Sequence, residues 1–265
     1  MYQTFYRILI ELTNGRVSSG LLKQFSQSRW SRPLIPLYVK KFNLDQQEFN
    51  NDMNAYTNLH DLFTRQLKQG TRPVTTDSSA VACPVDGVLE DAGEIRTDKK
   101  IVVKGKVYSM EEMVGDALFL EKYLGGKYLV LYLSPSHYHR IHAPISGSVI
   151  KRWTLGKKSY PVNKWGMKYG KEPLAKNYRT ITELQSEEGC ITMVKVGAMF
   201  INSIVITDDS RQLKKGQEFS YFSFGSTVVL LFEKDRFRLA ESLSVPADVR
   251  VGETIGHLAA KQEGV

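Results

Sequence analysis

The stretch Phe224-Gly225-Ser226-Thr227-Val228-Val229-Leu230-Leu231-Phe232 joins a turn sequence to a short apolar run. Apolar residues in a short run, bounded by turn residues, predict a buried β-strand. Similar runs recur between Gly, Pro and Asp residues at 81–82, 88–89, 101–103, 128–133, 149–150, 191–196 and 201–206. The chain from residue 80 onward is therefore predicted to consist mainly of strands.

Residues 1–70 have a different pattern, in which apolar residues recur at helical spacing. Basic residues are interleaved with them and with Trp30, namely Lys23, Arg29, Arg32, Lys40 and Lys41. A basic amphipathic stretch can lie on an anionic bilayer, although the same apolar face could pack on the rest of the protein. One further helix is predicted over 109–119, opened by Ser109 as N-cap with Glu112 three residues later.

Two Pro-x-x-Gly segments, Pro84-Val85-Asp86-Gly87 and Pro144-Ile145-Ser146-Gly147, each lead into a predicted strand. The second resembles the turns of biotinyl and lipoyl carrier domains, which are barrel-sandwich hybrids. The predicted fold class is α+β, with N-terminal helices followed by a mostly antiparallel β core that resembles such a hybrid. The expected division is 1–70 for the helical region and 71–265 for the β-rich domain.

The 265 residues carry a net charge of +8, which favours phosphate-bearing partners. Because no RNA-binding, zinc-finger or P-loop motif is present, an anionic membrane surface is expected rather than nucleic acid. No apolar run reaches the ~18 residues of a transmembrane helix, and the N-terminus does not resemble a signal peptide. Cys83 and Cys190 lie far apart in the sequence, so a reducing compartment is expected.

Gly225-Ser226-Thr227 alone is typical of a turn. It could also be a self-cleavage site, because the Ser226 hydroxyl could attack the carbonyl of Gly225, which has no side chain to obstruct the attack. The resulting ester would eliminate to dehydroalanine and hydrolyse to a pyruvoyl group and ammonia. This chemistry needs a base and an acid, for which histidine oriented by a carboxylate is suited.

Three of the five histidines lie close together, at positions 137, 139 and 142. In a strand, His137 and His139 would share one face, whereas His142 adjoins Ala143-Pro144 and is expected at a turn. No Cys or carboxylate accompanies the histidines at the spacing of a metal site, so no metal is predicted.

Together these segments resemble the phosphatidylserine decarboxylase family. The family pattern is an Asp-Gly segment, a Tyr-His-Arg-x-His-x-Pro segment and a Leu-Gly-Ser-Thr cleavage motif, in that order. This chain supplies Asp86-Gly87, Tyr138-His139-Arg140-Ile141-His142-Ala143-Pro144 and Gly225-Ser226-Thr227. The resemblance covers roughly residues 60–260 and includes Tyr160-Pro161-Val162-Asn163, Val196-Gly197-Ala198 and Ser203-Ile204. The chain departs from the pattern at Phe224, where Leu is usual, and at Asn177-Tyr178-Arg179, where the family often has Asn-Glu-Arg.

The resemblance implies that Ser226 is the self-cleavage nucleophile and becomes a covalent pyruvoyl cofactor. It implies that His142 and Asp86 complete the processing triad and that His139 assists decarboxylation. The chain would be cut between Gly225 and Ser226, and fragments 1–225 and 226–265 would remain partners. The implied substrate is phosphatidylserine and the product phosphatidylethanolamine.

The expected location is the cytoplasmic face of a membrane, with 1–70 as the membrane-associating region, and a homo-oligomer is possible. One alternative keeps the pyruvoyl group but decarboxylates a soluble amino acid. Another is a carrier module, for which no Met-Lys-Met attachment motif is present. A Ser-His-Asp hydrolase is the third, and it lacks a Gly-x-Ser-x-Gly elbow.

Overall fold

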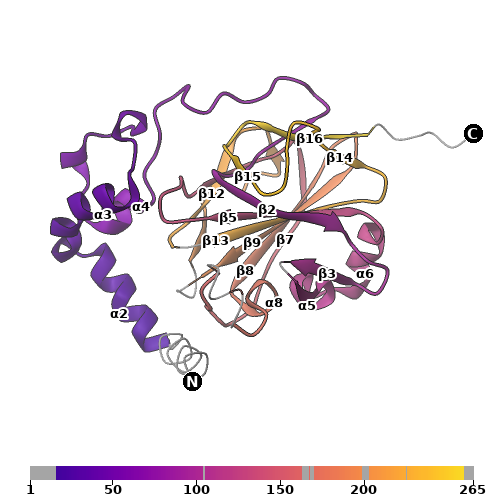
Figure 1. Ribbon diagram of the computed structural model, residues 1–265, viewed down its shortest axis with the longest axis horizontal. Helices are drawn as coiled ribbons and strands as arrows, with labels where there is room; N and C mark the ends of the chain where they lie inside the picture. Colours follow the sequence, from indigo (N-terminus) through magenta and orange to yellow (C-terminus); the bar gives the residue numbers. More distant parts are fainter. Residues whose placement is uncertain are drawn as a thin grey trace, which may run out of the picture.

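The computed structural model describes residues 16–103, 105–162, 167, 170–198, 203–224 and 226–259. Several sequence expectations lie outside these residues: the apolar pattern near the N-terminus, Ile201 of the predicted strand 201–206, Asn163 and Gly225. The N-terminal part is helical, as predicted, and lies to one side of a β body, to which a long connection over the top of Figure 1 joins it. Its elements are α2 (Arg16–Gln27), η1 (Arg29–Leu34), α3 (Ile35–Phe42), η2 (Gln46–Glu48), η3 (Met53–Ala55) and α4 (Leu59–Phe63).

The helical region has a small core of its own and is fixed to the β body by hydrogen bonds. Its buried apolar residues are Ile35, Val39, Leu44, Phe49, Tyr56 and Leu62. The Tyr38 hydroxyl donates to the Pro135 carbonyl at 2.8 Å, and Arg140 Nε donates to the Thr64 carbonyl at 2.9 Å. The Asn58 side chain caps α4 by accepting from the Asp61 N–H. These bonds place α4 beside the loop that contains His137 and His139.

An eight-stranded antiparallel sheet forms the centre of the β body, in the order β11-β7-β8-β9-β13-β5-β2-β15. Three smaller sheets accompany it, in the orders β10-β12-β6, β1-β16-β14 and β3-β4. The strand bounds are β1 (Ala80–Ala82), β2 (Gly87–Glu94), β3 (Lys100–Val103), β4 (Lys106–Ser109), β5 (Lys127–Leu133), β6 (Arg140–His142), β7 (Gly147–Leu155), β8 (Arg179–Gln185), β9 (Cys190–Gly197), β10 (Ile204–Ile206), β11 (Gln212–Leu213), β12 (Glu218–Phe222), β13 (Ser226–Phe232), β14 (Phe237–Leu239), β15 (Ala247–Val249) and β16 (Thr254–Leu258).

The large sheet is buried on both faces, which explains the unbroken apolar run at 228–232. On one face Val228, Leu230 and Phe232 pack with Phe219 and Phe222 of the smaller β10-β12-β6 sheet. On the other face, Val229 and Leu231 belong to a second core that includes residues of the helices below, Met110, Met113 and Leu120. Each fully buried side chain of this kind contributes about 1.5–3 kcal/mol. The α+β fold class is confirmed, with sandwich-like packing; within the described residues the large sheet stays open, ending at β11 and β15.

The helix predicted over 109–119 is instead two short helices, α5 (Met110–Val114) and α6 (Ala117–Leu120), so its predicted length was wrong. Ser109 caps α5 as predicted, accepting from the Glu112 N–H. Gly115 then ends α5 with φ 73°, a left-handed conformation that glycine adopts at little cost. Asp116 caps α6 in turn. The remaining short helices are η4 (Glu121–Tyr123) and α8 (Pro173–Lys176).

Candidate active site

Ser226 is the first residue of β13, a central strand of the large sheet, and lies where the neighbouring strands β5 and β9 end. It pairs with Leu133 of β5 on one side and with Gly197 of β9 on the other. The residue is fully buried, and its hydroxyl has no hydrogen-bond partner in the described part of the chain. A buried hydroxyl left unpaired costs about 1–3 kcal/mol, so its presence asks for a functional explanation. Gly225, the other half of the predicted cleavage site, lies outside the described residues.

His139 is fully buried in the loop between β5 and β6. Its Nδ1 lies 2.9 Å from the carbonyl of His137 and must be the protonated nitrogen, because a carbonyl can only accept. Its Nε2 is therefore the basic nitrogen, and it too has no partner. Burial, reinforced by the charge of Arg65, lowers the pKa of His139 well below 6.5. His139 is thus a neutral imidazole with a free basic nitrogen.

An aromatic contact joins His139 to the chain segment that leads into Ser226. The Phe63 ring of α4 lies 3.8 Å from the His139 ring and 5.4 Å from the Phe224 ring, centroid to centroid. In addition, the Phe222 N–H donates to the His139 carbonyl at 2.9 Å. The structure therefore brings His139 close to the segment that ends at Ser226. Phe224, which replaces the usual leucine, provides the ring that stacks on Phe63.

His60 of α4 is a residue that the sequence reasoning missed. Its ring centroid lies 6.2 Å from that of Phe224, and its buried Nε2 has no hydrogen-bond partner. Burial lowers its pKa, so it is neutral at pH 7. The signal in the sequence was weak: His60 stands at the start of the span of roughly 60–260 that resembles the family, outside its three motifs.

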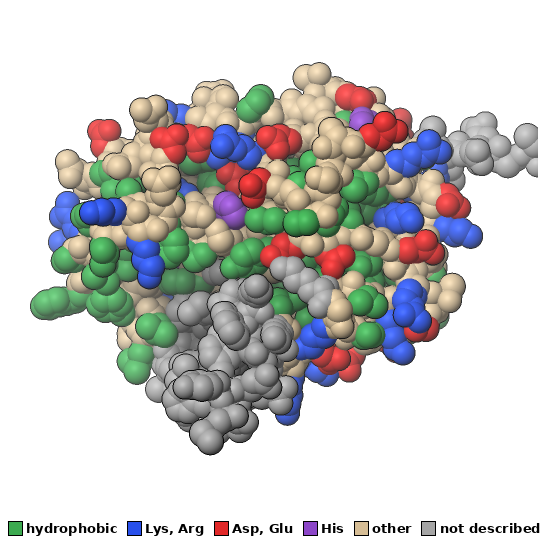
Figure 2. Space-filling view, in the orientation of Figure 1, with side chains coloured by type: hydrophobic (Ala, Val, Ile, Leu, Met, Phe, Trp, Pro, Cys, Tyr) green, Lys and Arg blue, Asp and Glu red, His purple; other side chains and the backbone are tan. Residues whose placement is uncertain are grey.

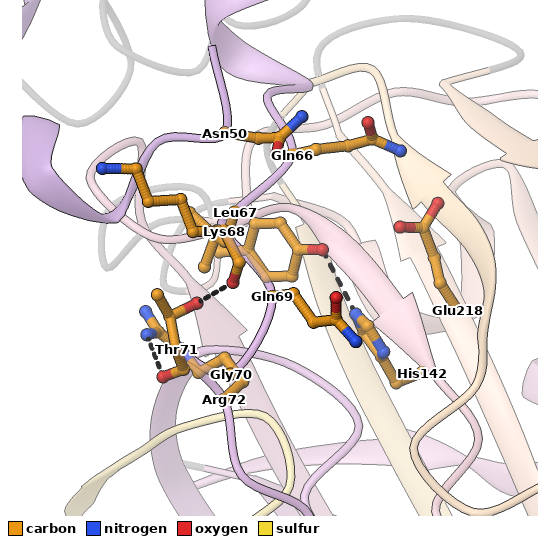
Figure 3. Close-up of a pocket in the computed structure, with 11 residues that line it drawn as sticks. Asn50, Gln66, Leu67, Lys68, Gln69, Gly70, Thr71, Arg72, His142 and Glu218 are labelled. Atoms are coloured by element: carbon orange, nitrogen blue, oxygen red, sulfur yellow. Dashed lines mark hydrogen bonds between the residues drawn. The ribbon is translucent and has the colours of Figure 1, made fainter.

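His142 occupies a more polar environment at the end of β6. Its Nδ1 donates to the Gly216 carbonyl at 2.8 Å, and its Nε2 lies 3.3 Å from the Tyr138 hydroxyl. It lines a pocket of about 350 Å³ between the chain segment around residues 66–72 and the β body, where Gln69 reaches toward its ring (Figure 3). Burial lowers its pKa, and the Gly216 carbonyl, Glu218 and Asp86 oppose that effect.

Asp86 lies in the loop between β1 and β2 and is 6% exposed. Its carboxylate accepts from Arg72 Nε at 3.0 and 3.1 Å, from Arg72 Nη2 at 2.6 Å and from the Val251 N–H at 2.9 Å. The loop does meet His142, whose N–H donates to the Pro84 carbonyl at 2.9 Å. Among the hydrogen bonds of the described residues, none joins Asp86 to a histidine. The triad remains a prediction, with Asp86 near His142 but bonded elsewhere.

Two arginines that the sequence reasoning did not assign hold this region together. Arg72 also donates to Glu48 of the helical region, at 2.9 and 2.8 Å, so it bridges two carboxylates. Arg65 is buried and donates to the carbonyls of Ser136 and His137 at 3.0 and 3.2 Å, which fixes the loop before His139. His137 and His139 lie in this loop and not in a strand, so strand alternation does not describe them.

The arrangement offers a buried hydroxyl, a neutral imidazole with a free nitrogen, and a second imidazole that reaches a polar pocket. These are the groups needed to deprotonate a serine and to return the proton to a leaving nitrogen. In the described part of the chain, His, Cys, Asp and Glu side chains form no group of three that could hold a metal ion.

Comparison with known proteins agrees with this chemistry. Residues 59–257 match the family model described as phosphatidylserine decarboxylase. A phosphatidylserine decarboxylase proenzyme from Geobacillus sp. (strain WCH70) is 54% identical over 258 residues, which cover 97% of this chain and 100% of the relative. The proenzyme from Anoxybacillus flavithermus is 52% identical over 263 residues, covering 99% of both chains. The chain belongs to the phosphatidylserine decarboxylase family.

Proposed function

We propose that this protein decarboxylates phosphatidylserine to phosphatidylethanolamine, using a pyruvoyl group formed from Ser226 when the chain cleaves itself between Gly225 and Ser226. The observation that carries the proposal is the buried, unpartnered hydroxyl of Ser226 at the start of a central strand of the large sheet. Near full-length similarity to proteins named as proenzymes supports it, because a proenzyme requires processing.

Self-cleavage needs no external reagent except water. Attack by Ser226 Oγ on the Gly225 carbonyl forms a C–O bond, and the C–N bond breaks as the serine proton passes through a base to the nitrogen. The ester then loses the Cα proton of residue 226 and releases the Gly225 carboxylate. The remaining dehydroalanine hydrolyses to the pyruvoyl group and ammonia. In this scheme His142 is the base. Burial lowers its pKa and keeps it neutral and able to accept the proton, and the Asp86 charge opposes that shift, which helps the imidazole to hold the proton once it has accepted it.

The residues around Ser226 fit a reactive carbonyl at this position. The pyruvoyl group supplies an electrophile that binds the substrate amine and accepts the electron pair left when carbon dioxide departs. The rings of Phe63 and Phe224 exclude water on one side. The free Nε2 of His139 can hold a proton and deliver it to the substrate carbon, which is the role proposed for this residue.

The C-terminal fragment would stay bound after the cut. Residues 226–232 pair along their whole length with β5 on one side and with β9 on the other. Val251 from the same fragment donates to Asp86 of the larger one. The cleaved chain 226–265 is therefore the expected partner of chain 1–225.

The N-terminal helices are proposed to hold the enzyme against the cytoplasmic face of a membrane. Exposed apolar side chains on α2, η1 and α3 are Leu21, Leu22, Phe25, Trp30, Leu34 and Leu37, and Trp30 is 85% exposed. Figure 2 shows apolar and basic side chains together at this end of the molecule. Each basic residue near an anionic surface contributes about 1 kcal/mol. In the described residues, no helix is both long and apolar enough to span a bilayer.

Membrane docking can be tested by replacing Trp30 and Leu37 with serine. Losing about 3 kcal/mol of apolar burial should weaken partition to phosphatidylserine vesicles on the order of a hundredfold. Leu118→Ser is the matched control, because Leu118 is 84% exposed on the β body, away from these helices. Equal co-sedimentation of the double variant and the control would exclude this docking face.

The proposed function is tested by intact mass together with an activity assay. Active protein should consist of chains 1–225 and 226–265, the second with a blocked N-terminus. Ser226→Ala should remain one uncut, inactive chain. An active enzyme that is a single chain would contradict the proposal, and activity on free serine but not on phosphatidylserine would favour the soluble amino acid alternative.

A further inference from the structure

Ser203 is a buried serine that none of the proposed steps uses. It directly precedes β10 in the smaller sheet and is 1% exposed. Among the residues that the structure describes, its hydroxyl has no hydrogen-bond partner, a property it shares with Ser226. By contrast, the buried Ser220 of the same small sheet donates its hydroxyl to the Val205 carbonyl at 2.9 Å. A small sheet that satisfies one buried serine and leaves another unpaired suggests that the second serves a different purpose.

The position of Ser203 relative to Ser226 follows from Gly197. A Cβ placed on Gly197 would lie 2.1 Å from Ser203 Oγ, so the Ser203 hydroxyl fills the space of a side chain at position 197. Gly197 is the direct partner of Ser226 across β9 and β13. Directly opposed residues point to the same face of a sheet, with their Cβ positions about 4.5–5.5 Å apart.

The Ser203 hydroxyl therefore lies next to the Ser226 side chain, on the same face of the large sheet. The packing agrees, because Val228 and Leu230, which follow Ser226 in alternation, share a core with Ile204, which follows Ser203. The Ser223 N–H donates to the Ser203 carbonyl at 2.7 Å and holds this backbone near the segment that leads to Ser226. The two unpaired hydroxyls do not bond to each other in the resting chain.

We propose, on the basis of the self-cleavage described above, that Ser203 is a further catalytic residue of that reaction. Its hydroxyl donates a hydrogen bond to the carbonyl oxygen that becomes negatively charged when Ser226 Oγ attacks the adjoining carbonyl carbon. The serine proton goes to the base, and the new C–O bond leaves the charge on that oxygen. Collapse then breaks the C–N bond as the base returns its proton to the leaving nitrogen. Ser203 keeps its own proton throughout.

A donor without a partner in the resting chain is suited to this role, because it need not break another bond as the charge develops. Position 197 must then be glycine, because a Cβ there would displace the Ser203 hydroxyl.

The test compares the rate of self-cleavage with the stability of the uncut chain. Ser203→Ala should slow appearance of the 226–265 fragment by about 10²–10³-fold, the usual effect of losing one such donor. Its melting temperature, measured in a Ser226→Ala background, should not fall, because no hydrogen bond of the resting chain is lost.

Ser220→Ala is the matched control and should give the opposite result. It removes a buried hydroxyl that is bonded, so the melting temperature should fall while cleavage keeps its rate. Gly197→Ala should slow cleavage by crowding Ser203. Adding Ser203→Ala should recover part of the stability without restoring the rate, because it removes the 2.1 Å contact. The new Cβ would then lie 3.5 Å from the Cβ at position 203 and 3.3 Å from the Tyr178 carbonyl oxygen, which must still shift slightly.

Cleavage of Ser203→Ala at the wild-type rate would overturn the role of Ser203 and leave the proposed function intact. A rate loss that matches a loss of stability in both serine variants would also overturn it, since that is the result of a packing role. If the wild-type chain is not cut before Ser226 at all, the proposed function itself fails.

Discussion

The two histidines of the Tyr-His-Arg-x-His segment lie only three positions apart, yet their surroundings differ. His139 is sealed against Phe63, and its Nε2 has no partner. His142 borders a polar pocket, and both of its ring nitrogens have partners. The difference shows that one short motif can present two imidazoles in two chemical environments, because the chain between them changes from a loop to a strand.

The largest expected effects are on cleavage and on decarboxylation, and they should differ between variants of the two histidines. His142→Ala should leave the chain uncut, because the proposed base is gone. His139→Ala should still be cut but lose about 10²–10⁴-fold in decarboxylation, the range for one acid–base group. Gel analysis of cleavage, followed by product release per cleaved enzyme, measures both. If each variant blocks the same step, the division of roles is wrong.

The free energy of unfolding should fall more when one member of the Arg72–Asp86–Glu48 ion pairs is lost than when an aromatic ring beside His139 is lost. Arg72→Gln leaves Asp86 and Glu48 without their shared guanidinium, and the Arg72 and Asp86 side chains are only 11% and 8% exposed. Breaking a buried pair in this way costs about 3–5 kcal/mol. Urea unfolding of the Ser226→Ala chain measures it. Arg179→Gln, at an arginine that is more buried than Arg72 and donates to backbone carbonyls, is a control for the loss of an arginine as such.

The buried His139 should also make the free energy of unfolding depend on pH. Because the folded pKa of His139 is well below 6.5, the unfolded chain takes up a proton that the folded chain does not. Its contribution is therefore lost as pH falls below about 6.5, by up to ~1.4 kcal/mol per pH unit. His139→Phe should reduce this slope between pH 6.5 and 5, and the remainder comes from His60, His137 and His142, whose pKa values burial also lowers. An unchanged slope would show that His139 can be protonated in the folded chain.

Glu48 also makes stability fall as the pH falls, but in a lower pH range. The hydrogen bond from Arg72 lowers its pKa below 4.5. Its contribution is present above that pH and is lost as pH falls through the lowered value. Glu48→Gln should therefore reduce the slope below pH 4.5 and leave the slope between pH 6.5 and 5 unchanged, which would separate the two regions.

The smallest effect is expected at Phe224. Phe224→Leu restores the residue usual in the family and removes the ring that stacks on Phe63. An aromatic pair contributes about 0.5–1.5 kcal/mol beyond its buried area, so the free energy of unfolding should fall by about that much. Cleavage should proceed normally. A strong loss of cleavage would instead mean that Phe224 itself orients the scissile segment.

The central strands could be predicted from the sequence because burial on both faces leaves continuous apolar runs such as 228–232. The motif residues were also identifiable, since each carries chemistry in its residue type. The pairing of Arg72 with Asp86 was not, because spacing along the chain does not reveal which charges meet after folding. The same holds for Ser203 and Gly197, whose proximity to Ser226 depends on two sheets packing together. The break in helix 109–119 depended on a single glycine.

The central position of β13 affects how the cleaved enzyme would unfold and refold. Before the cut, folding is unimolecular. If the chain is cut as proposed, the strand that begins with residue 226 becomes a separate molecule inserted between β5 and β9. Unfolding then also dissociates the two chains, so recovery becomes bimolecular and dependent on concentration. The stability of the cleaved enzyme would thus depend on a slow rate of unfolding, and protein denatured at low concentration would not refold.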